Sequence, residues 1–306
     1  MSRKFSLPQL QLAFKQGWGI GVGEDYRPWI RITRSRSSPM SNLRVTQIPY
    51  MRRSLHCLSR GEAHMVHFLR WLGASDIREQ YPMWNWPHAH PLAQLGEGLG
   101  QGEMHPGMGE VAEKANFTLR TYPGTDIRTV LTMDLMVTVP AETNPARLVA
   151  ISCKPLDRVL EGSEDDREIQ RLKLDRMYCE AGSIPFLLAH PEQLPRTLIV
   201  QLEAFGPVGD PDRFRVLTSS AEYADFIDRL ERLVYANPAM EAAQRAAKGL
   251  SWDQDTVVSA LRTSIWHQHV DVDLTAQISL ARPLRPGGRA FRAAQAAKWF
   301  GGRHEA

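Results

Sequence analysis

The chain has 306 residues, of which 43% are hydrophobic and 23% charged, a composition typical of a soluble protein long enough for two domains. Its formal net charge is +3, and no apolar run follows Met1 or is long enough to span a bilayer, so we expect no signal peptide and no membrane contact. The three cysteines are odd in number and far apart, which argues against a disulfide framework and a zinc knuckle and predicts a cytoplasmic location.

Basic charge is concentrated near both ends of the chain. No acidic residue lies between Asp25 and Glu62, and residues 282–306 are also rich in arginine. Such segments favour contact with phosphates, although a solvated surface explains either segment alone about as well. The candidate DNA-binding residues of the first segment are Arg27, Arg31, Arg34, Arg36, Arg52 and Arg53.

Residues 1–57 are rich in Gly, Pro, Ser and Arg and are predicted to form an irregular arm with short strands, one of them at 17–23. The first convincing helix begins near Ser59, which has capping-box spacing to Glu62. Glu62 also lies on the face of this helix that must be buried, where a carboxylate needs a partner such as a metal ion or Lys154. The structural and the functional interpretation of Glu62 are about equally supported.

Residues 76–83 are predicted to form a short strand, and a Gly/His/Pro-rich loop follows at 84–108. His88, His90 and His105 in this loop suggest a metal site. Nothing nearby supplies a fourth ligand, however, so zinc is only a minor alternative.

A β-hairpin is predicted over residues 127–154, with a turn at 140–145 that contains proline and asparagine. Because paired strands run antiparallel from the turn, a turn centred on Thr143 places Asp134 opposite Ser152. The position of the turn therefore decides which side chains meet.

In this register Asp134, Ser152 and Lys154 point to one face of the sheet, because side chains alternate along a strand. An acid and a lysine at one place suit a metal-dependent phosphodiesterase, in which the carboxylate binds Mg²⁺ and the ammonium orients water or neutralises phosphate charge. A cross-strand ion pair explains the same residues, and from the hairpin alone it is the better explanation.

A helix is predicted from Ser163 to Gly182, with acidic residues in its first turn and basic residues later, and a strand follows at 184–190. A helix bearing an acid, followed by strand, strand, helix and strand, is the arrangement of a restriction-endonuclease-like core. The fold class predicted for residues 1–208 is therefore α/β, with a restriction-endonuclease-like mixed sheet flanked by helices.

Residues 209–281 are predicted to form a small, mostly helical, winged-helix-like domain. The predicted helices cover residues 219–235, 238–248 and 252–266, and an alternating segment at 270–274 would form the wing. Winged helices usually bind DNA, but the first of these helices is acidic, so docking to a protein partner is as well supported. Residues 282–306 are predicted to be a basic C-terminal tail.

Short motifs along most of the chain occur in an order and spacing that are specific when taken together. They lie at residues 21–29, 58–62, 76–82, 105–106, 131–134, 151–154 and 172–180. With these motifs the sequence resembles the TnsA family, the endonuclease subunit of Tn7-type heteromeric transposases.

The resemblance implies that Glu62, Asp134, Ser152 and Lys154 are the catalytic residues. It also implies that Mg²⁺ is held by Glu62, Asp134 and the backbone carbonyl of Cys153, while Lys154 orients the attacking water. The departure from the family pattern is Ser152, which stands where the family usually has glutamine.

The function implied by the resemblance is cleavage of the 5′ ends of a transposon during cut-and-paste transposition, complementing 3′ cuts by a TnsB-like transposase. The implied partners are the DNA of the transposon ends, that transposase, and a TnsC-like ATPase bound through the C-terminal domain and tail; the expected location is cytoplasmic and nucleoid-associated. The alternatives are a stand-alone restriction or repair nuclease and a catalytically impaired scaffold that bridges the transposase and the ATPase.

Overall fold

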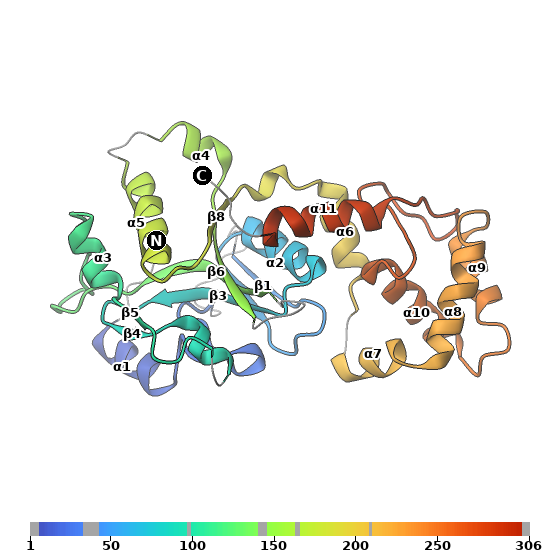
Figure 1. The fold of residues 1–306 in the computed structure, drawn as a ribbon, viewed down its shortest axis with the longest axis horizontal. Coiled ribbons are helices and arrows are strands. Elements are labelled where there is room, and N and C mark those ends of the chain that lie inside the picture. Colours follow the sequence, from blue (N-terminus) through green and yellow to red (C-terminus); the bar gives the residue numbers. More distant parts are fainter. Residues whose placement is uncertain are drawn as a thin grey trace.

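A four-stranded mixed sheet forms the centre of the computed structural model, which describes residues 6–32, 43–96, 99–139, 146–162, 166–207 and 210–301 (Figure 1). Its strand order is β3-β6-β7-β8. The bounds of these strands are Asp76–Met83, Leu131–Val139, Arg147–Cys153 and Phe186–Ala189. β3, β6 and β7 pair antiparallel, whereas β7 and β8 run parallel. The predicted α/β class with a mixed sheet is confirmed.

The register of the β6–β7 hairpin is the predicted one, because Leu135 pairs with Ile151 and Val139 with Arg147. The turn residues 140–145, including Thr143, lie outside the described residues. The prediction that the first strand starts at residue 127 is wrong. The strand β6 begins at Leu131. The residues before it have another partner, since the Asn85 amide donates to the carbonyls of Arg128 and Thr129.

Helices cover both faces of the sheet. On one face β6 and β7 contribute Leu135, Val137 and Ile151 to a core with α2 (Arg60–Leu72) and α6 (Arg196–Phe205). On the other face Met136 and Ala150 pack with α3 (Met108–Lys114) and α5 (Arg167–Ala181). The alternating apolar positions of the two strands thus fill two separate cores.

The two helices nearest the site begin at side-chain caps. Ser59 accepts a hydrogen bond from the backbone N–H of Glu62 at the start of α2, and Gly73 ends this helix in the left-handed conformation. At α5 the cap is Asp166, which accepts from the N–H of Glu168. Ser163, the predicted cap, lies outside the described residues.

Shorter elements surround the sheet. The N-terminal arm is not wholly irregular, because Leu10 and Ala13 are buried in α1 (Leu7–Lys15), whose first turn is held by the bond from the Ser6 N–H to Gln9. The remaining small elements are the β-pairs β1 (Arg44–Thr46) with β2 (Leu55–Cys57) and β4 (His88–Ala89) with β5 (Met104–His105), the helix α4 (Leu156–Leu160), and 3₁₀ turns at Gly23–Asp25, Pro91–Leu95 and Pro191–Gln193.

The C-terminal part of the chain is helical and lies to one side of the sheet (Figure 1). Its helices are α7 (Pro211–Thr218), α8 (Ala221–Leu233), α9 (Ala239–Ala246), α10 (Gln254–His267) and α11 (Gly288–Phe300). Between residues 210 and 301 the structure contains no strand. Val270, Val272 and Leu274, the alternating residues predicted to form a wing, are instead buried against the helices. The winged-helix prediction is therefore not confirmed.

Part of the predicted C-terminal tail is a packed helix. The ring of Trp299 in α11 lies 6.0 Å from that of Phe68 in α2, and Arg292 donates to the carbonyl of Trp71 at 2.7 Å. One apolar cluster runs from the sheet through α2 to α11. The boundary predicted at 208/209 falls on residues outside the described ones. Throughout the described ranges, each helix is too short or too polar to cross a bilayer.

Candidate active site

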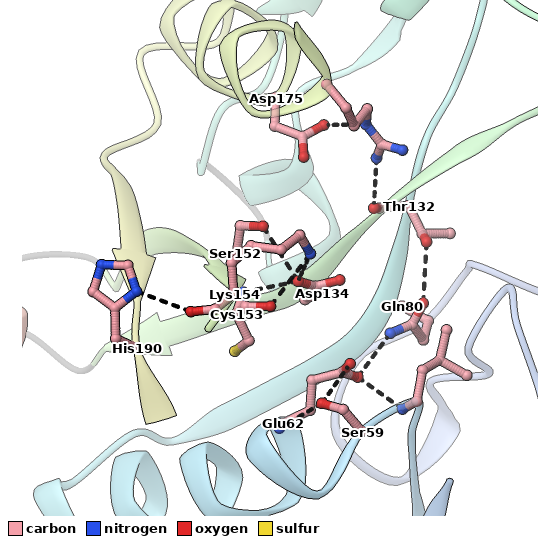
Figure 2. A network of polar contacts seen from close by, with 12 residues as sticks. Ser59, Glu62, Gln80, Thr132, Asp134, Ser152, Cys153, Lys154, Asp175 and His190 are labelled. Atoms are coloured by element: carbon pink, nitrogen blue, oxygen red, sulfur yellow. Dashed lines mark hydrogen bonds and ion pairs between the residues drawn. The ribbon is translucent and has the colours of Figure 1, made fainter. Parts of the chain in front are cut away.

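The carboxylate of Asp134 is the centre of a polar cluster at the edge where β6 begins and β7 ends (Figure 2). Its Oδ2 accepts hydrogen bonds from the Cys153 N–H at 2.8 Å and from Ser152 Oγ and Lys154 Nζ, both at 3.2 Å. The side chains of Asp134 and Lys154 are 16% and 22% exposed. The predicted meeting of Asp134, Ser152 and Lys154 is confirmed, and solvent reaches it.

The end of β8 fixes the backbone of this cluster. The Lys154 N–H donates to the carbonyl of Ala189, and His190 Nδ1 bonds the Lys154 carbonyl, both at 2.9 Å. Lys154 therefore leaves β7 in a defined direction even though it is one residue beyond the strand. Its ammonium also donates to the Cys153 carbonyl at 3.3 Å.

Lys154 is charged in this environment. Burial lowers the pKa of its ammonium, but the neighbouring Asp134 carboxylate more than offsets this effect, so the pKa lies above its usual value. The pair is thus an ammonium and a carboxylate that are hydrogen-bonded to each other and partly exposed to solvent. This is the ion pair expected from the hairpin, and on its own it fits a structural role as well as a catalytic one.

Glu62 is both a helix cap and a buried acid. Its Oε1 accepts from Ser59 Oγ at 3.1 Å, and its Oε2 accepts from the Leu58 N–H at 2.8 Å. The carboxylate therefore reaches back to the N–H of Leu58, one residue before the Ser59 amide that a capping box uses. Burial, followed by the charge of Asp134, raises the pKa of Glu62 to about 7. A residue that only caps a helix does not need a carboxylate whose burial costs this much free energy.

Two further groups near the site were missed by sequence reasoning. Gln80 of β3 donates from Nε2 to Glu62 Oε2 at 3.0 Å. Asp175 of α5 accepts from Arg171 at 2.7 Å, and burial raises its pKa to about 6 although Arg171 opposes the shift. The sequence carried no signal for Gln80, because every residue of β3 is buried and the strand therefore shows no alternation of polar and apolar residues.

The histidines of the 84–108 loop are held by the fold. His90 and His105 bond the carbonyls of Gly182 and Tyr178 at 2.7 and 2.8 Å, and His88 bonds the Tyr178 hydroxyl at 3.1 Å. No group of three or more His, Cys, Asp or Glu side chains within the described residues is arranged to hold a metal ion. The zinc alternative therefore has no support in the described part of the chain.

The candidate DNA-binding arginines differ in their surroundings. Arg53 is largely buried and bonds both oxygens of Glu79, whereas the exposed Arg52 pairs with Asp210 and Asp212. Arg27 is exposed and donates to the Gln16 carbonyl, and the Arg31 guanidinium lies 5.5 Å from the Trp18 ring centroid. Arg34 and Arg36 lie outside the described residues.

Comparison with known proteins gives one informative result. No family profile matches the chain. The transposition protein TnsA of transposon Tn7 from Escherichia coli is 26% identical to it over 185 residues. The chain is therefore TnsA-like. This finding supports the resemblance deduced from the motifs. The match covers 60% of the chain and 57% of the TnsA protein, so little more than half of that relative is represented.

Proposed function

We propose that the chain is the metal-dependent DNA endonuclease subunit of a heteromeric transposase and cuts the 5′ ends of its transposon. The observation that carries the proposal is the Asp134–Lys154 pair, which lies beside the buried acid Glu62 in a TnsA-like chain. The restriction-endonuclease-like arrangement of helix, hairpin, helix and strand supports the same reaction class. Within such a site, cleavage is hydrolysis of a phosphodiester bond.

The donor atoms of the site fit Mg²⁺. Within the described residues, Asp134 Oδ1 accepts no hydrogen bond, and Glu62 Oε1 accepts one. Together with the Cys153 carbonyl these are hard oxygen ligands, which Mg²⁺ prefers, and the remaining positions suit the several waters that it normally retains. When bound, the ion would polarise the scissile phosphate and lower the pKa of a bound water.

The protein's own groups have distinct roles in this proposal. Lys154 holds a positive charge at the exposed edge of the site, where it orients the attacking water and counters the charge of the phosphate. Ser152 and the Cys153 N–H fix the rotamer of Asp134 by bonding its Oδ2. Ser152 thereby orients the Asp134 carboxylate. In this proposal it does not take over the role of the glutamine that the family usually has at this position.

Cleavage should require Mg²⁺, and more of it at low pH. Because the pKa of Glu62 is about 7, the carboxylate becomes neutral below that pH and loses its ability to bind a cation. The Mg²⁺ concentration for half-maximal cleavage of transposon-end DNA, measured with the partner transposase and ATPase present, should therefore be higher at pH 6 than at pH 8. Excess Mg²⁺ should restore the rate at pH 6. A half-maximal concentration that is equal at both pH values would contradict this role of Glu62.

The arginine-rich arm is proposed to contact phosphates of the transposon end. Removing one such contact reduces the slope of log K against log[salt] by about 0.9 on duplex DNA. Replacing Arg27 and Arg31 together by alanine should therefore flatten the slope by up to about 1.8 in a binding titration. Arg52→Ala is the matched control, because this arginine is already paired with two aspartates and should leave the slope unchanged. An unaltered slope in the double variant would assign the arm to solvent or a protein partner.

The helical C-terminal part is proposed to bind the TnsC-like ATPase, with the TnsB-like transposase as the second partner. Its helix α8 presents exposed acids, including Glu222 and Asp228. Other acids of the same helix are paired within the fold, since Asp225 bonds Arg229 and Glu231 bonds Arg289. An acidic face of this kind favours a basic protein surface over DNA.

A further inference from the structure

Gln80 has an unusual backbone for its place in the sheet. Its neighbours Glu79 and Tyr81 pair with Leu135 and Met133 of β6, whereas Gln80, level with Asp134, has a φ of +49° and is not paired. A residue with a Cβ rarely adopts this left-handed conformation. The N-terminal segment maintains the conformation, because the Trp29 N–H donates to the Gln80 carbonyl at 3.3 Å. Such local strain often marks a functional site.

The side chain of Gln80 connects Glu62 to β6 (Figure 2). Its Nε2 donates to Glu62 Oε2 at 3.0 Å, and its Oε1 accepts from Thr132 Oγ1 at 3.0 Å. The two partners together fix the orientation of the amide, because an ionised carboxylate can only accept and therefore faces the nitrogen, which leaves the oxygen to accept from the hydroxyl. Gln80 is completely buried, so water does not substitute for either contact.

The bond from Gln80 decides which oxygen of Glu62 stays available. A carboxylate oxygen has about two lone pairs. Those of Oε2 are used by the Leu58 N–H and the Gln80 amide, whereas Oε1 receives only the Ser59 hydroxyl. The remaining acceptor position of Glu62 is therefore on Oε1.

We infer that Gln80 is a positioning residue that fixes the rotamer of Glu62 and directs its Oε1 toward a divalent cation. The inference rests on the proposed function, because it assigns Glu62 to the metal site. It also explains the strained backbone of Gln80 within a buried strand: the displaced backbone brings the amide to Glu62, and Thr132 holds it there.

The test is Mn²⁺ binding to the purified full-length chain, measured by calorimetry between pH 5.5 and 8.5. Gln80→Met preserves the length of the side chain but removes the donor, and the affinity should fall by about tenfold to a hundredfold, as is typical when an outer-shell partner of a metal ligand is removed. Because the ionised carboxylate then has one donor fewer, the pKa of Glu62 should rise and the pH midpoint of Mn²⁺ binding should move upward. Gln201→Met is the matched control, since Gln201 is also buried but donates to the Ala276 carbonyl.

A second pair of variants covers the case in which Gln80→Met does not fold. Thr132→Val removes the hydroxyl that orients the amide, so it should weaken Mn²⁺ binding in the same direction, and Thr132→Ser should restore the wild-type affinity. If Gln80→Met and Thr132→Val both bind Mn²⁺ with the wild-type affinity and pH midpoint, the inference about Gln80 is wrong, but the proposed function is not affected. Absence of Mn²⁺ binding by the wild-type chain would overturn the proposed function together with it.

Discussion

Replacing Asp134 by alanine should abolish 5′-end cleavage while the fold and partner binding persist. The substitution removes the acceptor of three hydrogen bonds and leaves the Lys154 ammonium without its carboxylate, at a partly exposed edge rather than in an apolar core. The loss of activity should exceed the roughly hundredfold effect of an outer-shell change. Cleavage of labelled transposon ends is the direct measurement. In cells, cointegrates should replace simple insertions, because the partner's 3′ cuts and joining remain possible.

Two companion variants make this result interpretable. Asp134→Asn has nearly the same shape but no charge, so it should be as inactive as Asp134→Ala if the carboxylate is what matters. Lys154→Ala should also be inactive, and both should bind the partner proteins normally. Simple insertions at the normal rate in the Asp134 variants would exclude Asp134 from the chemistry.

Ser152→Ala is the graded comparison at the same carboxylate. It removes one of the three bonds to Asp134 Oδ2 and leaves those from the Cys153 N–H and Lys154 intact, so it should cost at most about tenfold to a hundredfold. A variant as inactive as Asp134→Ala would make Ser152 a direct participant. If the wild type cuts nothing with all partners and Mg²⁺ present, while Ser152→Gln does cut, the chain is a scaffold that has lost catalysis.

The hairpin could be predicted because few physical rules determine it. A strand has a period of two residues, and an antiparallel pair is fixed once its turn is placed, so Asp134 and Ser152 had to meet. Lys154 followed from the same alternation. Helix periodicity singled out Glu62 as an acid on a buried face, and the family resemblance then assigned it to the same site as the hairpin residues.

Gln80 could not be found in this way. β3 is buried along its whole length, so its sequence shows no alternation that indicates which polar residue faces the site. The left-handed backbone that turns Gln80 toward Glu62 is imposed by contacts with distant segments, including Trp29. The absence of the predicted wing has a related explanation. Val270 and Val272 alternate with polar residues because they are buried against helices, and the described C-terminal part contains no strand with which they could pair.

Neighbouring arginines illustrate the same limit. Sequence places Arg52 and Arg53 in one basic segment, yet their environments are set by residues far along the chain. The Arg53 side chain is 10% exposed and bonds Glu79, which is fully buried, whereas that of Arg52 is 58% exposed beside Asp210. Arg53 thus has its hydrogen-bonding capacity committed within the fold, and we assign it a structural role.

Replacing Arg53 by methionine should be the most destabilising single change in the arm. It would leave the Glu79 carboxylate buried, with the His56 N–H as a remaining donor and no compensating charge. Breaking a buried pair in this way typically costs about 3–5 kcal/mol in the free energy of unfolding. Urea unfolding at pH 8 measures this loss of stability. Arg52→Ala is the control and should change stability much less, because an exposed pair is screened by water.

The pH dependence and a double variant identify the cause of that destabilisation. Burial raises the pKa of Glu79 and Arg53 opposes the shift, so removing Arg53 should raise the pKa further. The destabilisation should therefore be greatest at pH 8 and shrink as the pH falls through the raised folded-state pKa of Glu79, because the carboxyl is then neutral in both folded proteins. Combining Arg53→Met with Glu79→Met should recover most of the stability, since paired replacement by apolar groups is often neutral. A double variant as unstable as Arg53→Met would mean that poorer packing, rather than an uncompensated charge, is responsible.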